Sequence, residues 1–352
     1  MTPHHPRSGN VLIKLVVFLL LIGAGVVALL ASTLAVAYQG FATPVILDFP
    51  KGTSASAMAD QLADAGVIRY SWQFVLARML HPAARLKAGE YQFAKADTTW
   101  NIFSRIVRGD VFFYELVVPE GSNMFDIAAS VEQFGFLKGA DFIRAVRDPS
   151  LIHDLAPQAP TLEGYLFPST YRITRKSSVY EICQKMTDQF RKQWRQLPRG
   201  RSDLSVNQIV TLASLVEKET AVKEERPIVA SVYRNRLGLG MPLDCDPTTI
   251  YASMLDQRYR GTIYRSDLQS TNQYNTYQHA GLPPGPIANP GAASLKAALE
   301  PASSDYLYFV AKADGSGGHQ FSRTAEEHSR AVQGYRKNLK KADTASAARK
   351  GV

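Results

Sequence analysis

Cysteine is scarce in this sequence, with only Cys183 and Cys245 among 352 residues. Two cysteines are too few for a disulfide framework or a cysteine-rich metal site. Nothing in their spacing indicates contact, so we interpret them as separate small apolar thiols, with a disulfide in an oxidising compartment as the alternative. No His/His or Cys/Cys pair stands at zinc-ligand spacing, so the sequence predicts no metal site, even with Asp244 and Asp246 flanking Cys245.

Motifs for nucleotide chemistry are also missing. The chain has no Walker loop, no dinucleotide fingerprint and no Gly-x-Ser-x-Gly elbow, and we expect no cofactor. Lys and Arg number 40 against 31 Asp and Glu, which gives a net charge of +9. Basic surfaces attract nucleic acid, anionic lipid or anionic polymer. Because the basic residues are scattered and no recognition motif accompanies them, we expect no nucleic-acid partner.

One long segment near the N-terminus lacks charge. From Leu15 to Ala37 about 23 residues are uncharged, enough to cross a hydrocarbon core about 30 Å thick. Arg7 and Lys14 precede this run and the next basic residue is Lys51, so the positive-inside rule places the N-terminus in the cytoplasm. A cleaved signal peptide ending at Ala35–Ala37 is the alternative, but the apolar run is longer than signal peptides use. In both readings the remainder of the chain is exported.

The exported chain contains an internal repeat, because Phe49–Thr53 aligns without gaps on Val118–Ser122. Each copy predicts a strand end, a Pro/Gly turn, a helix capped by Thr53 or Ser122, and a glycine stop. Small βα units of this kind suit glycan binding, but they can equally be structural, and the sequence leaves both readings open. Further aligned pairs are Ala59 with Ala128, Leu62 with Val131, Gly66 with Gly135, and Ile68 with Leu137.

Other segments carry ordinary signals for helices, strands and loops. Asp246 precedes Pro247 as the cap of a further helix. The proline-rich stretches 283–286 and 289–291 predict surface loops placed over a site, and the basic residues from Lys337 predict a mobile tail. We expect strands at 86–93, 162–173 and 306–312, and helices at 179–195, at 208–237 with a second helix starting at Pro227, and from about Thr324.

The segment Leu212–Thr220 contains two carboxylates that helix geometry separates. The apolar side chains from Ile209 to Val216 average to one direction, from which Glu219 lies about 60° away and Glu217 about 100°. Burial beside apolar neighbours should raise the pKa of Glu219 and let it donate a proton at neutral pH, as glycosidic bond cleavage needs. The alternative is a helix end with solvated charges.

Several side chains of types that hold sugars surround this segment in the sequence. Aromatic rings stack on sugar faces, and amides and hydroxyls bond sugar hydroxyls. Taken singly, each also has a structural reading as rim packing or a turn residue. The candidates are Asn235, Tyr274, Asn275, Tyr277 and His319.

Five ordered segments resemble a known family, the endolytic murein transglycosylases of the MltG or YceG-like family. The resemblance covers the chain from about Phe49 to about Lys337, behind an N-terminal anchor. Cys245 departs from the family pattern and is given no role. The segments are EGYLFPSTY (163–171), LASLVEKET (212–220), DPTTIY (246–251), YNTYQHAGLPPGPIANPG (274–291) and GGHQF (317–321).

This resemblance implies an α+β fold in which a LysM-like α/β subdomain is joined to a mainly helical catalytic domain with a loop-rich C-terminal part. It also implies that Glu219 is the catalytic glutamate. Glu219 with Thr220 is similar to the Glu-Ser dipeptide of other lytic transglycosylases, so Thr220 is a further substrate-binding candidate. The resulting layout is a cytoplasmic segment 1–14, a transmembrane helix 15–38, the LysM-like subdomain 39–160, the catalytic domain 161–337 and the tail 338–352.

The implied reaction cleaves the bond between N-acetylmuramic acid (MurNAc) and N-acetylglucosamine (GlcNAc) without water. Glu219 would act first as acid and then as base, leaving a 1,6-anhydroMurNAc end. The family is associated with nascent peptidoglycan strands near the membrane, with synthases (penicillin-binding proteins) as partners. The expected location is the inner membrane, single-pass, with the catalytic domain periplasmic.

Two other functions stay open at this point. A hydrolytic muramidase would use Glu219 as acid and Asp244 or Asp246 as the second carboxylate. A non-catalytic glycan-binding scaffold of the division machinery would use the same surface without cleaving.

Overall fold

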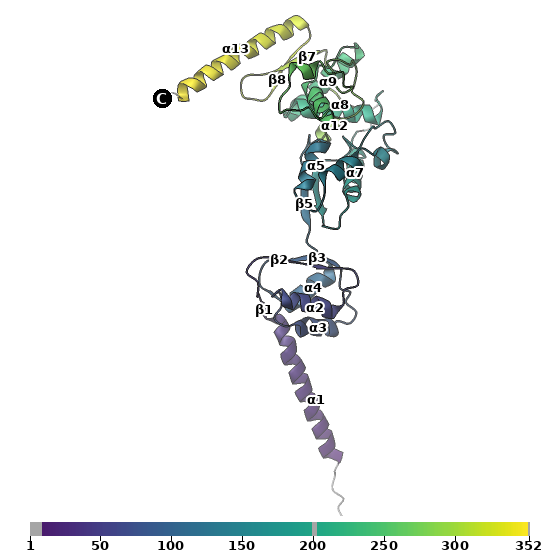
Figure 1. Cartoon of the computed structure of the whole chain (residues 1–352), viewed down its shortest axis with the longest axis vertical. Helices are drawn as coiled ribbons and strands as arrows, with labels where there is room; N and C mark the ends of the chain where they lie inside the picture. Colours follow the sequence, from purple (N-terminus) through teal and green to yellow (C-terminus); the bar gives the residue numbers. More distant parts are fainter. Residues whose placement is uncertain (1–8, 199–202, 351–352) are drawn as a thin grey trace, which may run out of the picture. The chain divides into compact units, whose positions relative to one another are not determined.

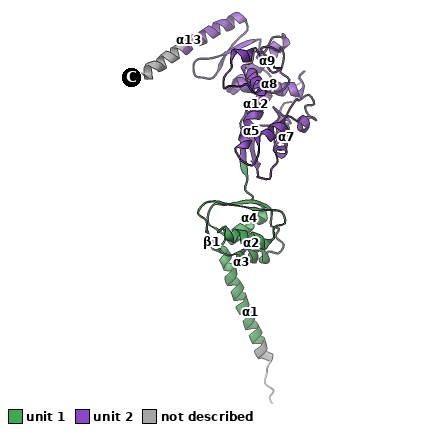
Figure 2. Ribbon diagram, viewed as in Figure 1, with its two compact units in different colours: residues 1–114 green, residues 115–352 purple. Residues whose placement is uncertain are grey.

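The computed structural model describes residues 9–198 and 203–350, with side chains for 13–198 and 203–339. The chain divides into two compact units, residues 1–114 and 115–352 (Figures 1 and 2). Helices and strands are mixed, as the α+β prediction required. The strands of the described residues form two-stranded sheets, which pair β1 with β4, β2 with β3, β5 with β6, and β7 with β8.

The first unit begins with α1 (Gly9–Ser32), which contains most of the apolar stretch Ile13–Ala35. In the described part of the chain this is the one helix long and apolar enough to cross a membrane. We predicted a helix to residue 38, but α1 ends at Ser32 and a 3₁₀ turn, η1 (Thr33–Ala35), follows. The helix stops because Leu34 inserts into the hydrophobic core of the unit, where it is 4% exposed.

The first repeat copy has a strand-helix-helix-strand order, from residue 45 to residue 93, and shares one apolar core with the other elements of the first unit. β2 and β3 pair antiparallel, from Val45 opposite Phe93 to Phe49 opposite Gly89. Phe49, Phe74 and Tyr91 are buried between this pair and the helices. The elements are β1 (Ala37–Tyr38), β2 (Val45–Phe49), α2 (Ala55–Asp64), α3 (Ser71–Leu80), β3 (Gly89–Phe93), β4 (Asp97–Thr98) and α4 (Thr99–Arg108).

The second copy of the repeat has the same order, and it opens the second unit. Gly52 and Gly121 occupy matching turns with φ of +91° and +76°, a left-handed conformation that favours glycine. The predicted repeat is therefore also a structural repeat. Its second copy consists of β5 (Tyr114–Val118), α5 (Met124–Glu132), α6 (Gly139–Val146) and β6 (Ser169–Ile173).

The helix caps of the two copies lie one residue beyond the predicted Thr53 and Ser122. The Ser54 hydroxyl accepts the Ala57 N–H, and the Asn123 side chain accepts two N–H groups at the start of α5. Thr53 is still part of the turn, because its hydroxyl donates to the Pro50 carbonyl at 2.8 Å.

Asn289 joins the second repeat copy to the remainder of the second unit. Its Oδ1 accepts the N–H groups of Gly164 (2.8 Å) and Leu166 (2.9 Å). Its Nδ2 donates to the Ser122 carbonyl (2.9 Å) and to Glu163 Oε1 (2.7 Å). The boundary that we predicted after residue 160 therefore falls inside the second unit, because buried hydrogen bonds cross it.

Glu163 is a fully buried carboxyl at this junction. Its Oε2 accepts the Met124 N–H at 2.8 Å and the Tyr251 hydroxyl at 3.0 Å. Burial raises the pKa of Glu163 to about 7, although these donors favour the charged form.

The second unit is built around α8 (Val206–Glu219), whose residues Ile209–Val216 are buried on every side. α8 packs against α9 and α12 (Figure 1). The helices predicted at 179–195 and 208–237, with a break before Pro227, are confirmed. The remaining elements are η2 (Pro149–Ile152), α7 (Val179–Trp194), η3 (Lys223–Glu225), α9 (Arg226–Gly238), α10 (Asp246–Leu255), α11 (Arg265–Leu268), α12 (Ala292–Leu299), β7 (Tyr308–Ala311), β8 (His319–Ser322) and α13 (Ala325–Lys350).

The proline-rich segment 283–291 is mostly buried, so the prediction of surface loops was wrong here. Proline lacks an N–H group, which leaves fewer donors to satisfy in irregular buried chain. The remaining groups have partners: the Ile287 N–H donates to Ser214 Oγ at 3.1 Å, and the Pro284 carbonyl accepts from Asn207 Nδ2 at 3.1 Å. This segment packs beside α8 instead of covering a surface.

Two smaller differences concern helix ends. Cys245 occupies the cap position of α10, so Asp246 is its first residue and not its cap. The segment 338–350, which we predicted as a mobile tail, forms the end of α13. Its mobility stays a prediction.

Asn289→Ala should destabilise the second unit by about 3 to 5 kcal/mol, because it leaves the N–H groups of Gly164 and Leu166 and the Oε1 atom of Glu163 without their buried partner. Urea unfolding of the detergent-solubilised chain measures this. Gln269→Ala, at an exposed position of the same unit, is the control and should change stability by less than about 0.5 kcal/mol. Equal stability of the two variants would contradict the role given to Asn289.

Glu163 should also make stability depend on pH. The folded state keeps its proton up to a pKa of about 7, whereas the unfolded chain loses it near 4.5. Its contribution is therefore complete below about pH 4.5 and is lost, by about 3 kcal/mol, as pH rises through about 7. Unfolding of wild type and Glu163→Gln across this range tests the expectation. If both proteins show the same pH slope, Glu163 does not titrate as described.

Candidate active site

Glu219 is the last residue of α8, at the point where the buried helix reaches a cavity. The residue is partly exposed, but its carboxyl group is almost fully enclosed. Thr220 ends the helix with an extended backbone, and its hydroxyl accepts the Val222 N–H at 3.0 Å. Thr220 is 2% exposed, so its side chain shapes the turn that holds Glu219 in place.

The cavity has a volume of about 420 Å³ and is lined by residues from several elements of the second unit. Its walls come from the end of α8, from α9, from residues 243–246 at the start of α10, from the loop that carries Tyr277, from β7 and from α13. It contains three carboxyl groups and three phenols. The lining residues are Glu219, Tyr233, Arg236, Leu243, Asp244, Asp246, Tyr277, Tyr308, Phe309, Val310, His328 and Val332.

Burial raises the pKa of the Glu219 carboxyl, and its neighbours modify that effect in both directions. Hydrogen bonds from Cys245 and Tyr233 lower the pKa, Asp246 raises it through its charge, and His319 lowers it. The Tyr233 hydroxyl donates to Oε1 at 2.9 Å. In the described residues no lysine or arginine forms an ion pair with Glu219. Uncharged donors therefore hold a carboxyl that burial favours in its protonated form.

Glu217 differs from Glu219 in its partners and not in its burial. Our helical-phase argument placed Glu217 further from the core, but its side chain is only 5% exposed. Arg226 Nη2 lies 3.0 Å from Glu217 Oε1, and the Gly291 N–H donates to Oε2 at 2.9 Å. A buried guanidinium beside it suits a structural carboxylate, so the two glutamates lie in different electrostatic surroundings.

The other two carboxyl groups of the cavity have close partners. Asp246 Oδ1 accepts the Tyr277 hydroxyl at 2.7 Å, and Asp244 Oδ2 lies 3.0 Å from Arg236 Nη1. Of the predicted sugar-contact residues, Tyr277 is the one that lines this cavity together with Glu219.

His319 lies on β8 and is fixed by one carboxylate. Glu225 Oε1 accepts its backbone N–H at 2.8 Å, and Oε2 lies 2.7 Å from Nδ1. In the described chain Nε2 has no hydrogen-bond partner. The imidazole is close enough for its charge to lower the pKa of Glu219. This arrangement fixes the ring through Nδ1 and leaves Nε2 free to bond another group.

The remaining sugar-contact candidates have structural partners. Asn275 is fully buried, and its Nδ2 donates to three carbonyls of the 267–270 segment. Asn235 Nδ2 donates to the carbonyls of Ser304 and Tyr306, ahead of β7. Tyr274 packs its ring 5.2 Å from that of Tyr251. These three residues position loops around the site.

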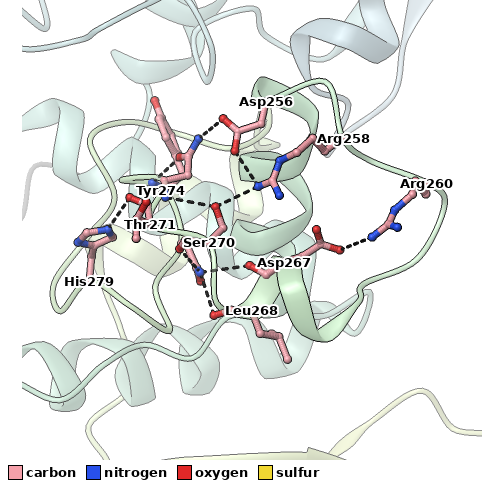
Figure 3. A network of polar contacts seen from close by, with 11 residues as sticks. Asp256, Arg258, Arg260, Asp267, Leu268, Ser270, Thr271, Tyr274 and His279 are labelled. Carbon is pink, nitrogen blue, oxygen red and sulfur yellow. Dashed lines mark hydrogen bonds and ion pairs between the residues drawn. The ribbon is translucent and has the colours of Figure 1, made fainter.

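Figure 3 shows the polar network that orders the loop carrying Tyr277. Arg258 bonds Asp256 (2.9 Å) and Ser270 Oγ (3.1 Å), and His279 Nε2 lies 3.1 Å from the Thr271 carbonyl. These hydrogen bonds fix the loop, and the loop places Tyr277 at the cavity.

Our reading of the sequence missed two side chains that touch Glu219. Tyr233 lies on α9, 14 residues after Glu219, and no motif in the sequence marks it. Cys245, to which the sequence gives no role, lies close enough to the Glu219 carboxyl for its thiol to lower the pKa of Glu219. Both cysteines are free and buried, as we expected of separate thiols. In the part of the chain that the structure describes, no three His, Cys, Asp or Glu side chains group in a way that could hold a metal ion.

Comparison with known proteins identifies relatives over most of the chain. It is 32% identical over 312 residues to an endolytic murein transglycosylase of Bacillus subtilis (strain 168), covering 83% of this chain and 85% of that protein. It is 28% identical over 319 residues to an endolytic murein transglycosylase of Streptococcus pneumoniae (serotype 2, strain D39 / NCTC 7466), covering 82% of this chain and 58% of that protein. The chain thus spans less than two thirds of the pneumococcal protein.

A solved structure shares the fold. The crystal structure of a yceG-like protein from Listeria monocytogenes matches with a TM-score of 0.53 at 32% identity, covering 82% of this chain and 98% of that one. A mixed helical and stranded fold of this class is therefore common to the two proteins. A family model described as YceG-like matches residues 47–334, and the chain belongs to the YceG-like family.

Tyr233→Phe should raise the pKa of Glu219 further, because it removes a donor that favours the charged carboxylate. Cys245→Ala should shift the pKa in the same direction. Infrared titration of the carboxyl stretch measures this, with Glu219→Gln identifying the band.

Tyr180→Phe is the matched control for this titration, since Tyr180 is 53% exposed on α7 and outside the cavity. A lower pKa of Glu219 in Tyr233→Phe would show that the phenol does not act as the donor.

Proposed function

We propose that this protein is a membrane-anchored lytic transglycosylase that cuts peptidoglycan strands between MurNAc and GlcNAc, with Glu219 as its acid and base. The observation that carries the proposal is the buried Glu219 carboxyl, which faces the cavity, accepts a hydrogen bond from Tyr233 and forms no ion pair with a lysine or arginine of the described chain. The printed name of the Bacillus subtilis relative, an endolytic murein transglycosylase, supports the reaction class.

In the proposed reaction Glu219 gives its proton to the oxygen that bridges the two sugars, and the bond from that oxygen to the MurNAc anomeric carbon breaks. The carboxylate then takes the proton of the MurNAc C6 hydroxyl, whose oxygen forms a new bond to the same carbon. Glu219 ends as it began and no water is consumed. The internal hydroxyl replaces a bound nucleophile, and its high effective concentration favours the ring closure.

We assign direct sugar contacts to Tyr277 and His319. Tyr277 lines the cavity, and Glu225 fixes the His319 ring through Nδ1, which leaves Nε2 without a hydrogen-bond partner in the described chain. Asn235, Tyr274, Asn275 and Thr220 are assigned positioning roles, since their side chains have partners within the fold.

The proposed setting is the outer side of the inner membrane. α1 would be the single-pass anchor with the N-terminus in the cytoplasm, since the basic residues of the N-terminal region precede the apolar span. We interpret the strand-helix-helix-strand repeats as LysM-like glycan-binding units. Nascent strands would then be the substrate and peptidoglycan synthases the partners.

A hydrolytic muramidase remains a second candidate, because Asp244 and Asp246 line the same cavity as Glu219. In that reaction one of them would activate water or attack the sugar. Asp244 is paired with Arg236, and Asp246 accepts a bond from Tyr277, so neither stands free in the described structure. This observation, with the names of the relatives, favours the lytic reaction.

Glu219→Gln should abolish cleavage of polymeric glycan strands, a fall of at least about 10³-fold, because the amide can neither give nor take the proton. Asp246→Asn should lower cleavage by about tenfold or less if Asp246 only orients Tyr277, and as severely as Glu219→Gln if it is a second catalytic carboxylate. Chromatography of the digested strands measures both.

Glu224→Gln is the matched control, because Glu224 is an exposed glutamate close to the same helix end. It should cleave as wild type does. Retained binding of glycan strands by Glu219→Gln shows that the variant is folded, and retained cleavage would show that the acid lies elsewhere.

A further inference from the structure

The described part of the first unit exposes large apolar side chains mainly in one place beyond α1. Ile46, at 37% exposure, is the exception. The others lie on α3, on the residue before it, or directly after η1, and we call this group the α3 face. It consists of Val36 (65% exposed), Tyr70 (51%), Trp72 (41%), Met79 (71%) and Leu80 (44%).

α3 is apolar on two sides. Phe74 and Ala77 are buried in the core, whereas Trp72 and Met79, seven residues and about two turns apart, lie together on the opposite side. Tyr70 stacks near Trp72, with ring centroids 6.3 Å apart. An exposed apolar face of this kind marks a site that contacts another protein or a membrane.

The α3 face lies where the apolar span ends. η1 packs against α3 and α4, and Gln73 Nε2 of α3 lies 3.4 Å from the Thr33 carbonyl. Figure 1 shows α3 beside the end of α1, with β2 and β3 on the other side of this unit. The span Ile13–Ala35 has 23 residues. At 1.5 Å per residue it is about 34 Å long, slightly more than a hydrocarbon core of about 30 Å, so Thr33–Ala35 lies at the membrane boundary.

The chemistry of the α3 face suits that boundary. Trp and Tyr are enriched at membrane interfaces, where their rings are half-buried and their polar atoms reach water. Met and Leu side chains would enter the acyl region. Arg69 lies two residues before α3 and is exposed, with its guanidinium 5.7 Å from the Tyr70 ring centre. It can reach anionic headgroups while its alkyl stem covers apolar surface.

We propose that the α3 face binds the surface of the bilayer that α1 crosses, so that the first unit rests on the membrane instead of moving freely on a tether. The occupant is the lipid headgroup and upper acyl region of that leaflet. The inference rests on α1 as a membrane span, as proposed above, but it is independent of the reaction at Glu219.

The test uses the full chain reconstituted into vesicles of phosphatidylcholine and phosphatidylglycerol. Trp100→Phe with Trp194→Phe leaves Trp72 as the one tryptophan of the sequence. In vesicles whose lipids carry bromine on the upper acyl chain, Trp72 emission should be roughly twofold or more weaker than in vesicles without bromine, because its ring lies within the interface. Its emission maximum should also lie at a shorter wavelength than that of a tryptophan in water. Met79→Glu with Leu80→Glu in this background should remove most of the quenching while leaving the near-ultraviolet circular dichroism unchanged.

Ile46→Trp, with all three native tryptophans changed to Phe, is the matched control in the same unit. Its tryptophan lies on β2, away from the α3 face, and should not be quenched by brominated lipid. Protein that resists alkaline carbonate extraction has α1 in the bilayer. If Trp72 is unquenched in that fraction, the α3 face does not bind lipid, although α1 still crosses the membrane. If carbonate releases the protein, both the α3 proposal and the assignment of α1 as a membrane span are wrong.

Discussion

The enclosed carboxyl of Glu219 is the constraint around which the second unit is arranged. Burial raises the pKa of a carboxyl, whereas donors that favour its charged form lower it. Here Glu219 is the last residue of the buried helix α8, and its neighbours Tyr233 and Cys245 are uncharged. The nearby Glu217 is equally buried but is neutralised by Arg226. The same helix thus carries one carboxylate that is paired with Arg226 and one, Glu219, that we propose as the proton donor.

That arrangement depends on how the chain is held behind α8. Asn289 and Glu163 connect the second repeat copy to the buried proline-rich segment, which packs beside α8. The repeat at the start of the second unit is therefore part of the framework of the site and not a separate module. The first repeat copy lies in the other unit, with the apolar span, where the α3 face points to contact with lipid.

Local features were predictable from the sequence, and contacts between distant segments were not. Helical periodicity gave α7 and the break between α8 and α9, and the glycine turns gave the repeat. Helical phase selected Glu219 but failed for Glu217, because Arg226 buries a carboxylate that periodicity places at the edge. The proline-rich segment was misassigned because composition does not show that Asn207 and Ser214 satisfy its backbone. Tyr233 and Cys245 meet Glu219 only through tertiary packing.

The central claim is that the site cuts a glycan strand by internal transfer and without water. Mass spectrometry of strands cut in water enriched in heavy oxygen tests it most directly. The account predicts new MurNAc ends that are lighter by one water than a reducing end and that carry no heavy oxygen. New reducing ends labelled with heavy oxygen would contradict it, and they would assign the cavity, with Asp244 or Asp246, to hydrolysis.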